Sequence, residues 1–135
     1  MTETKKTTVS EKDIPKAPAL PVTGVIDRAT VKRFEEIEGL PKTGYISGQY
    51  TGFAKYMPAM ASISFEDYGC ELVKRIASSV PDIPDTGGII NQDFIEGLQK
   101  YLVKLDILKP GSYDHGILDK STAEAIQNRL NTGAF

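Results

Sequence analysis

Few residues in this chain have side chains suited to catalysis. Its 135 residues include one histidine, His115, and one cysteine, Cys70, beside 18 acidic residues. A zinc hydrolase site needs several histidine, cysteine or carboxylate ligands, and a nucleophilic triad needs a base of the histidine type. A single histidine argues against both arrangements. We therefore expect no metal and no cofactor.

A carboxylate pair that cleaves glycosides is the remaining catalytic option. The acidic residues, however, fall where helices need them for other reasons. Asp27 and Asp119 stand at predicted helix starts, where a carboxylate accepts hydrogen bonds from free amides. The helical pattern places four more on exposed helix faces, namely Glu35, Glu36, Glu96 and Glu124. The sequence therefore predicts a chain that is not an enzyme.

Tyrosines near the predicted loops favour a binding function. Tyrosine joins an apolar ring to a polar tip, which suits carbohydrate and peptide ligands. Tyr45 and Tyr50 lie beside predicted helix starts, where Arg28 and Gln49 add hydrogen-bonding groups. The alternative for both tyrosines is burial in the core, because the corresponding residues in the repeats described below are apolar.

The segment Tyr113-Asp114-His115 is the strongest candidate for contact with a ligand. It lies in a turn-rich loop between Pro110 and Gly116. Loops carry binding residues more often than cores do. The predicted ligand-binding residues are therefore Arg28, Tyr45, Gln49, Tyr50, Tyr113, Asp114 and His115.

Charge and hydropathy exclude several classes of partner. The net charge is −2 and the isoelectric point about 5.4, and the sequence has no basic stripe of the kind that binds duplex nucleic acid. No apolar run approaches the ~18 residues of a membrane span. The polar start, Met1 to Lys6, is followed by no apolar segment, so the sequence predicts no signal peptide. We expect neither nucleic acid nor a membrane as partner.

A short pattern recurs four times and organises the chain. It consists of a glycine, two apolar residues and a residue of the type that caps a helix N-terminus. Each copy, called here a turn motif, therefore predicts a tight turn, a short extended pair and a helix start. Turn motifs 1 to 4 are Gly24-Val25-Ile26-Asp27, Gly44-Tyr45-Ile46-Ser47, Gly88-Ile89-Ile90-Asn91 and Gly116-Ile117-Leu118-Asp119. Similar leaders precede the first three: Leu20-Pro21-Val22-Thr23, Leu40-Pro41-Lys42-Thr43 and Ile83-Pro84-Asp85-Thr86.

The spacing of apolar residues predicts about five helices. The apolar pairs of the turn motifs are too short to form a sheet, so we expect them to fix the loops to the core. The fold class predicted is all-α, a small duplicated helical bundle with short extended turn segments. The predicted helices run from Asp27 to about Glu38, after Ser47 to Pro58, from Phe65 (capped by Ser64) to about Ser78, from Gln92 to Leu108, and after Asp119 to about Asn131.

Composition divides the chain into three parts. Residues 1–19 are polar and then proline-rich, which predicts a flexible linker or tail. The proline-rich stretch from Val80 to Gly87 is the best candidate boundary within the rest. We therefore expect a first half over residues 20–80 and a second half over residues 81–135.

The second half resembles a known family. Leu102 to Leu108, followed by Tyr113 to Gln127, is similar to the peptidoglycan-binding-like domain of bacterial and phage cell-wall hydrolases. The segment from Leu20 through Phe34 to Gly44 is similar to the same repeat. The sequence departs from the family signature at His115, Asp119 and Ile126.

This resemblance implies a non-catalytic domain that binds cell-wall peptidoglycan, through its glycan or its stem peptide. It implies a catalytic domain linked on the N-terminal side, as in an endolysin or autolysin, and action at the cell wall outside the cell. The alternative is a protein–protein interaction or structural module of a phage particle or a cell-surface assembly.

Overall fold

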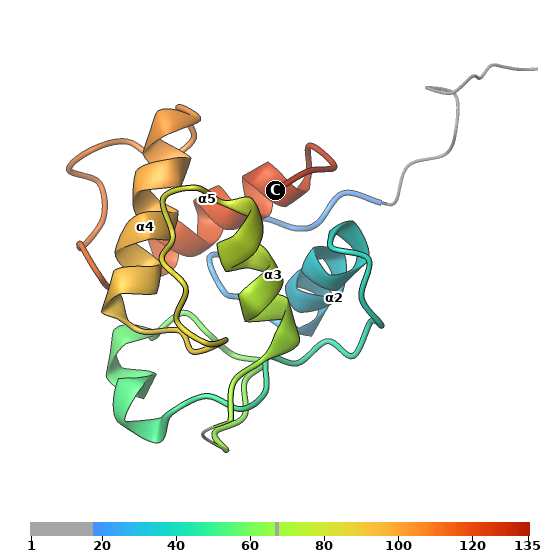
Figure 1. Ribbon diagram of the computed structural model, residues 1–135. Coiled ribbons are helices and arrows are strands. Elements are labelled where there is room, and N and C mark those ends of the chain that lie inside the picture. The colour runs from blue at the N-terminus through green and yellow to red at the C-terminus, as the bar shows by residue number, and fades with distance from the viewer. Residues whose placement is uncertain (1–17, 67) are drawn as a thin grey trace, which may run out of the picture.

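The computed structural model describes residues 18–66 and 68–135, so the predicted linker lies almost entirely outside the described residues. Five helices occur in this part of the chain (Figure 1), and its only β-pairings are two isolated bridges. The predicted all-α class is confirmed. The elements are α2 (Arg28–Ile37), the 3₁₀-helix η1 (Thr51–Tyr56), α3 (Glu71–Ser79), α4 (Gln92–Lys104) and α5 (Lys120–Leu130).

Three of the four turn motifs start a helix as predicted. The side chains of Asp27, Asn91 and Asp119 accept hydrogen bonds from the amides three residues later, at 2.8 to 3.0 Å. The two aspartates also accept hydrogen bonds at 2.7 Å from the hydroxyls of Thr30 and Thr122. These caps satisfy amides that an α-helix leaves free at its start.

The second turn motif departs from the prediction. Ser47 starts no α-helix, and the predicted helix to Pro58 is reduced to the short 3₁₀-helix η1. The next predicted helix begins at Glu71 instead of Phe65, so Ser64 is not its N-cap. The backbone of this stretch instead forms hydrogen bonds with the second turn motif and its neighbour. The Ser64 amide donates to the Ile46 carbonyl at 2.8 Å, and the Gly69 amide donates to the Gly48 carbonyl at 2.7 Å.

Helix α4 is also shorter than predicted. It ends at Lys104 instead of Leu108, because Asp106 adopts a left-handed backbone conformation with φ of 61°. The amides of Ile107 and Leu108 then donate to the Leu102 carbonyl. Leu108 remains buried after the helix ends, so its apolar character predicted burial correctly and the helix boundary incorrectly.

A single hydrophobic cluster joins the two predicted halves. Val31 and Phe34 of α2 belong to the same buried cluster as Leu102 of α4 and Ile126 of α5. In Figure 1 the segment around Leu20 lies next to the end of α5. The Asn131 side chain accepts from the Leu20 amide at 2.7 Å and donates to the Leu20 carbonyl at 3.0 Å. The start and end of the described fold are therefore bonded directly.

Each turn motif is held by one buried side chain, which we call its clasp residue. Gln127 Oε1 accepts from the amides of Thr23 and Gly24 at 2.9 and 3.0 Å. Glu35 Oε1 accepts from the Gly44 amide at 2.8 Å, and Gln99 Oε1 from the Gly116 amide at 3.0 Å. Glu35 was expected on an exposed face, yet only 4% of it is exposed, because this bond needs its carboxylate beneath the turn.

The clasp residues connect the repeats in a closed cycle. Glu35, Gln99 and Gln127 follow their own N-caps at the same spacing in the sequence. Helix α2 thus supplies the clasp residue of turn motif 2, α4 that of motif 4, and α5 that of motif 1. Turn motif 3 is held by Gln49, whose Oε1 accepts from the Ile90 amide at 2.7 Å.

Residues 49–68 form an insertion within the second repeat. Gly48 and Gly69, at its two ends, are joined by the 2.7 Å hydrogen bond described above. After Gly69 the chain continues into α3 and then into the leader of turn motif 3, which is the order found in the first repeat. Gln49 therefore supplies from the insertion the contact that a helix supplies in the other repeats.

The later part of the insertion crosses the centre of the fold. The Ile26 amide donates to the Ala59 carbonyl at 2.8 Å, and the Ile46 amide to the Ser62 carbonyl at 2.9 Å. The Leu118 amide donates to the Tyr56 carbonyl at 2.7 Å. One short segment therefore bonds the second apolar residue of turn motifs 1, 2 and 4. The expectation that the apolar pairs fix the loops to the core is confirmed for this residue and is wrong for Val25 and Tyr45, which are exposed.

Replacing Gln127 with alanine will destabilise the fold by about 3 kcal/mol, because the buried amide of Gly24 and its neighbour Thr23 lose their acceptor. Chemical denaturation measures the loss. The control is Asn128→Ala, at the adjacent exposed position of α5. Equal free energies of unfolding for the two variants would show that the clasp contributes nothing.

Replacing Gly48 with alanine will cost about 2 kcal/mol more than replacing Gly39 with alanine. Both glycines have positive φ, 68° and 75°, so backbone strain is common to the two variants. A β-carbon at Gly48 would overlap the carbonyl oxygen of Gly69, whereas one at Gly39 meets nothing within 4 Å. The difference in thermal unfolding between the variants isolates the contact that closes the insertion.

Candidate functional site

Two of the predicted residues, Arg28 and Tyr45, lie together on the surface. The Arg28 guanidinium carbon is 5.1 Å from the centre of the Tyr45 ring, a cation–π contact. The stem of Arg28 also lies over Gly44, so the arginine covers the outer side of the turn that Glu35 holds from within. Tyr45 is 49% exposed, and the alternative that it is a core residue is wrong.

Tyr50 is also on the surface, at the start of η1, with 41% of its area exposed. In a 3₁₀-helix the side chains of residues three apart align on one face. Tyr50, Phe53 and Tyr56 accordingly form a row, with ring centres 5.3 and 6.1 Å apart. The core alternative is therefore wrong for Tyr50, while Phe53 and Tyr56 are half-buried against the core.

The side chain of Gln49 is not accessible to a ligand. Its exposure is 0%, and both ends of its amide bond within the chain. Besides accepting from Ile90, its Nε2 donates to the carbonyls of Gly88 and Ser47 at 2.9 and 3.0 Å. The prediction that Gln49 binds a ligand is therefore not supported, because each of its polar atoms has a hydrogen-bond partner within the chain.

The Tyr113-Asp114-His115 segment borders a pocket of about 410 Å³ on the side of α4. The rings of Tyr113 and His115 are 5.0 Å apart between centres and tilted by 44°. Glu96 and Lys100 of α4 also line this pocket, so charged residues of both signs and two aromatic residues share its lining. Asp114 is exposed beside it, and its amide donates to Asp119 Oδ2 at 2.9 Å.

The carboxylate of Asp119 links the loop that carries Tyr113 to the start of helix α5. Partial burial acts to raise the pKa of its carboxyl, but hydrogen bonds outweigh this effect and hold the pKa below the ordinary value of 3.8. The donors are the amide of Asp114 and the amide and hydroxyl of Thr122. Ionised Asp119 therefore fixes the Tyr113 loop to the start of α5.

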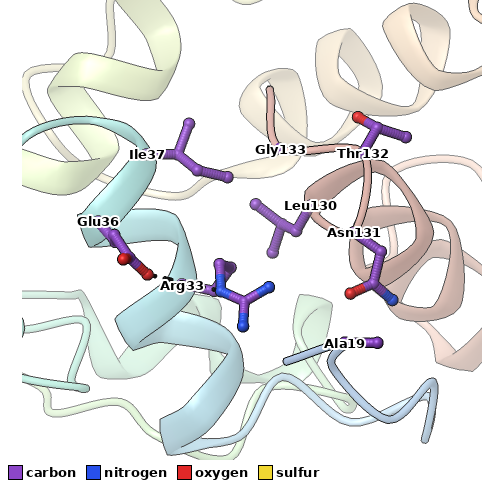
Figure 2. A pocket seen from close by; sticks show the side chains of 8 residues that line it. All are labelled: Ala19, Arg33, Glu36, Ile37, Leu130, Asn131, Thr132 and Gly133. Carbon is purple, nitrogen blue, oxygen red and sulfur yellow. Dashed lines mark ion pairs between the residues drawn. The ribbon is translucent and has the colours of Figure 1, made fainter. Parts of the chain in front are cut away.

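A further pocket, of about 530 Å³, lies between α2 and the end of α5 (Figure 2), and it was not predicted from the sequence. The Arg33–Glu36 ion pair, 3.6 Å between Nε and Oε1, lies on its α2 side. Leu130 and Asn131 line the opposite side. No repeated pattern could have predicted it, because α2 and the end of α5, which supply its walls, are far apart in the sequence.

The structure thus brings the predicted residues together in parts. Arg28 contacts Tyr45, and Tyr113 contacts His115 beside Asp114, whereas Tyr50 packs on Phe53 and Gln49 is internal. Within residues 18–66 and 68–135 no group of three or more His, Cys, Asp and Glu is placed to hold a metal ion. None of the described helices is long and apolar enough to cross a membrane.

Comparisons of the chain with protein-family models, with curated proteins and with solved structures found no match.

Lowering the pH will remove stability that Asp119 contributes. Its folded-state pKa is depressed, so this contribution is complete above 3.8 and is lost as the pH falls through the folded-state value. Between about pH 5 and pH 2, the wild type should lose more stability than Asp119→Asn, which cannot titrate. Urea denaturation across this range measures both, with Asp106→Asn, an exposed position, as control. Parallel curves for wild type and Asp119→Asn would refute the assignment.

Proposed function

We propose that this chain is a non-catalytic domain that binds bacterial cell-wall peptidoglycan and holds a linked hydrolase at the wall. The observation that carries the proposal is the pocket beside Tyr113 and His115. Two aromatic residues line a pocket of about 410 Å³ together with Glu96 and Lys100. Rings of this kind pack on the apolar faces of sugars, and the charged groups suit the hydroxyls, amides and ionised groups of a glycan with attached peptides.

The repeated architecture supports the same proposal. Its regular parts, the caps and clasp residues, are used to build the fold, whereas Tyr113-Asp114-His115 precedes only the fourth turn motif. The exposed Arg28–Tyr45 pair is a second, separate surface of similar chemistry. Two weak contacts on one domain can together give much tighter attachment to a repetitive polymer than either alone.

Exposed rings on the insertion favour a second candidate function, that of a protein–protein interaction module. Phe65 and Tyr68 are exposed near its end, at 38% and 65%. Large exposed rings are typical of protein interfaces. Such a module would bind a protein of a phage particle or cell-surface assembly in place of the wall polymer.

Sedimentation with purified cell walls tests the leading proposal. The chain should sediment with walls of at least one of several bacteria and should leave their turbidity unchanged. The double variant Tyr113→Ala, His115→Ala should bind roughly tenfold more weakly, because it removes both rings from the pocket. Failure to sediment with every wall, or clearing of the walls by the chain alone, would contradict the proposal.

The control for that experiment is Tyr68→Ala, which removes an exposed ring from the insertion. It should bind walls as the wild type does. Equal weakening by Tyr68→Ala and by the double variant would move the binding surface to the insertion. Far-ultraviolet circular dichroism confirms that each variant has the wild-type helix content.

A further inference from the structure

Glu35 is the exception among the four clasp residues, because the other three are glutamines. A glutamine amide accepts with its oxygen and donates with its nitrogen. Accordingly, Nε2 of Gln127, Gln99 and Gln49 donates to turn carbonyls, those of Val25, Ile117 and Gly88, at 2.8 to 2.9 Å. An ionised glutamate only accepts, so turn motif 2 receives no such donor.

Turn motif 2 therefore has more hydrogen-bond acceptors than donors. The Thr43 hydroxyl donates to Glu35 Oε2 at 2.7 Å. The Tyr45 carbonyl, which corresponds to that of Val25, is 3.4 Å from the same hydroxyl. One hydroxyl carries one hydrogen, so it cannot serve both oxygens. In turn motif 1 the Val25 carbonyl has the amide of Gln127 as well.

The charge of Glu35 is also unusual for so buried a residue. Its carboxylate accepts from two neutral groups, the Gly44 amide and the Thr43 hydroxyl. Among the described residues, no ion pair joins it to a cation. The nearby Arg28 lies on the Tyr45 ring, and Arg75 pairs with Glu71 at 3.3 Å. Burying a charge without an opposite charge is costly, whereas a glutamine at this position would carry no such cost.

Glu35 lines a pocket that can admit a partner. The pocket measures about 240 Å³, and the groups around Glu35 that line it are of two kinds. The polar or aromatic ones are Thr43, Tyr45, Ser47 and Glu71, and the others are Leu40, Pro41, Cys70 and Leu72. Beside its apolar residues, the lining therefore has a buried carboxylate, two hydroxyls, a second carboxylate and an aromatic residue. These groups suit a small cation that donates several hydrogen bonds.

We propose that the pocket lined by Glu35 and Tyr45 binds a primary ammonium group, with Glu35 as its counter-ion. An ammonium carries one positive charge and three N–H donors, which matches the missing charge and the surplus of acceptors. Its identification as a free amino group of the peptidoglycan stem peptide rests on the proposed function. The proposal that the pocket binds an ammonium group does not depend on the proposed function.

The variant Glu35→Gln provides a matched test. Thr43 and Tyr45 correspond in the sequence to Thr23 and Val25, which Gln127 holds, so glutamine at position 35 can reproduce that arrangement and keep the fold. The probe is Nα-acetyl-lysine amide, which carries one primary ammonium, and the readout is the amide chemical shift of Gly44 and Tyr45. The ligand control is the same molecule acetylated on its side-chain nitrogen. The protein control is Glu36→Gln, at the adjacent exposed position.

Wild type and Glu36→Gln should show saturable shifts with the lysine probe and none with the acetylated one. Glu35→Gln should bind the lysine probe at least roughly tenfold more weakly, since a charge-assisted contact is lost. Equal binding by Glu35→Gln, equal binding of the acetylated probe, or no shifts in the wild type would each overturn the proposal. If Glu35→Gln does not fold, the comparison of the two probes on the wild type decides.

Purified walls separate this proposal from the proposed function. Walls whose free amino groups have been acetylated should retain the wild-type protein less well than untreated walls. Unchanged retention would show that amino groups of the wall are not the ligand of the pocket, while leaving wall binding intact. Binding of the lysine probe without binding of any wall would leave the pocket assignment standing and remove the wall as its source.

Discussion

The fold depends on the burial of one polar side chain behind each turn. A turn that begins with glycine presents backbone amides and carbonyls toward the core, where water cannot reach them. Gln127, Glu35, Gln49 and Gln99 meet these groups with short hydrogen bonds. Because unpaired polar groups in a core are costly, each clasp residue fixes where its helix must lie relative to the next turn. The hydrophobic cluster then fills the space that these bonds define.

Local chemistry made much of the helix pattern predictable. Asp27, Asn91 and Asp119 cap the helices that the turn motifs predicted, because a capping residue acts on amides only three positions away. The predictions failed where distant contacts decide. Phe65 was assigned to a helix on its apolar spacing, but the backbone around it pairs with Ile46 and Gly48, which are remote in the sequence. Glu35 was placed on the surface because a sequence pattern gives no sign that a turn nearby needs an acceptor.

The candidate site was less predictable than the fold. Alignment of the repeats predicts burial in the core for Tyr45, because its equivalents Val25 and Ile89 are apolar. Val25 is in fact exposed as well, and that position of turn motifs 1 and 2 points outward while Ile26 and Ile46 point inward. Gln49 stood out as a polar residue in a repeat loop, yet the insertion turns it inward. The type of a side chain and its position in a loop therefore indicated candidate ligand-binding residues. Only the packing of the folded chain showed which of them lie on the surface and which are internal.

The closed cycle of clasp contacts affects how the chain folds. Open repeat proteins grow by adding neighbours, so their contacts are local in sequence and any repeat can nucleate. Here the first turn is completed by Gln127, 103 or 104 residues away in the chain. The entropy of closing so long a loop must be paid before that contact forms, which favours slow, all-or-none folding. A chain ending before α5 would leave its first turn without an acceptor, so repeats cannot be removed from this fold one at a time.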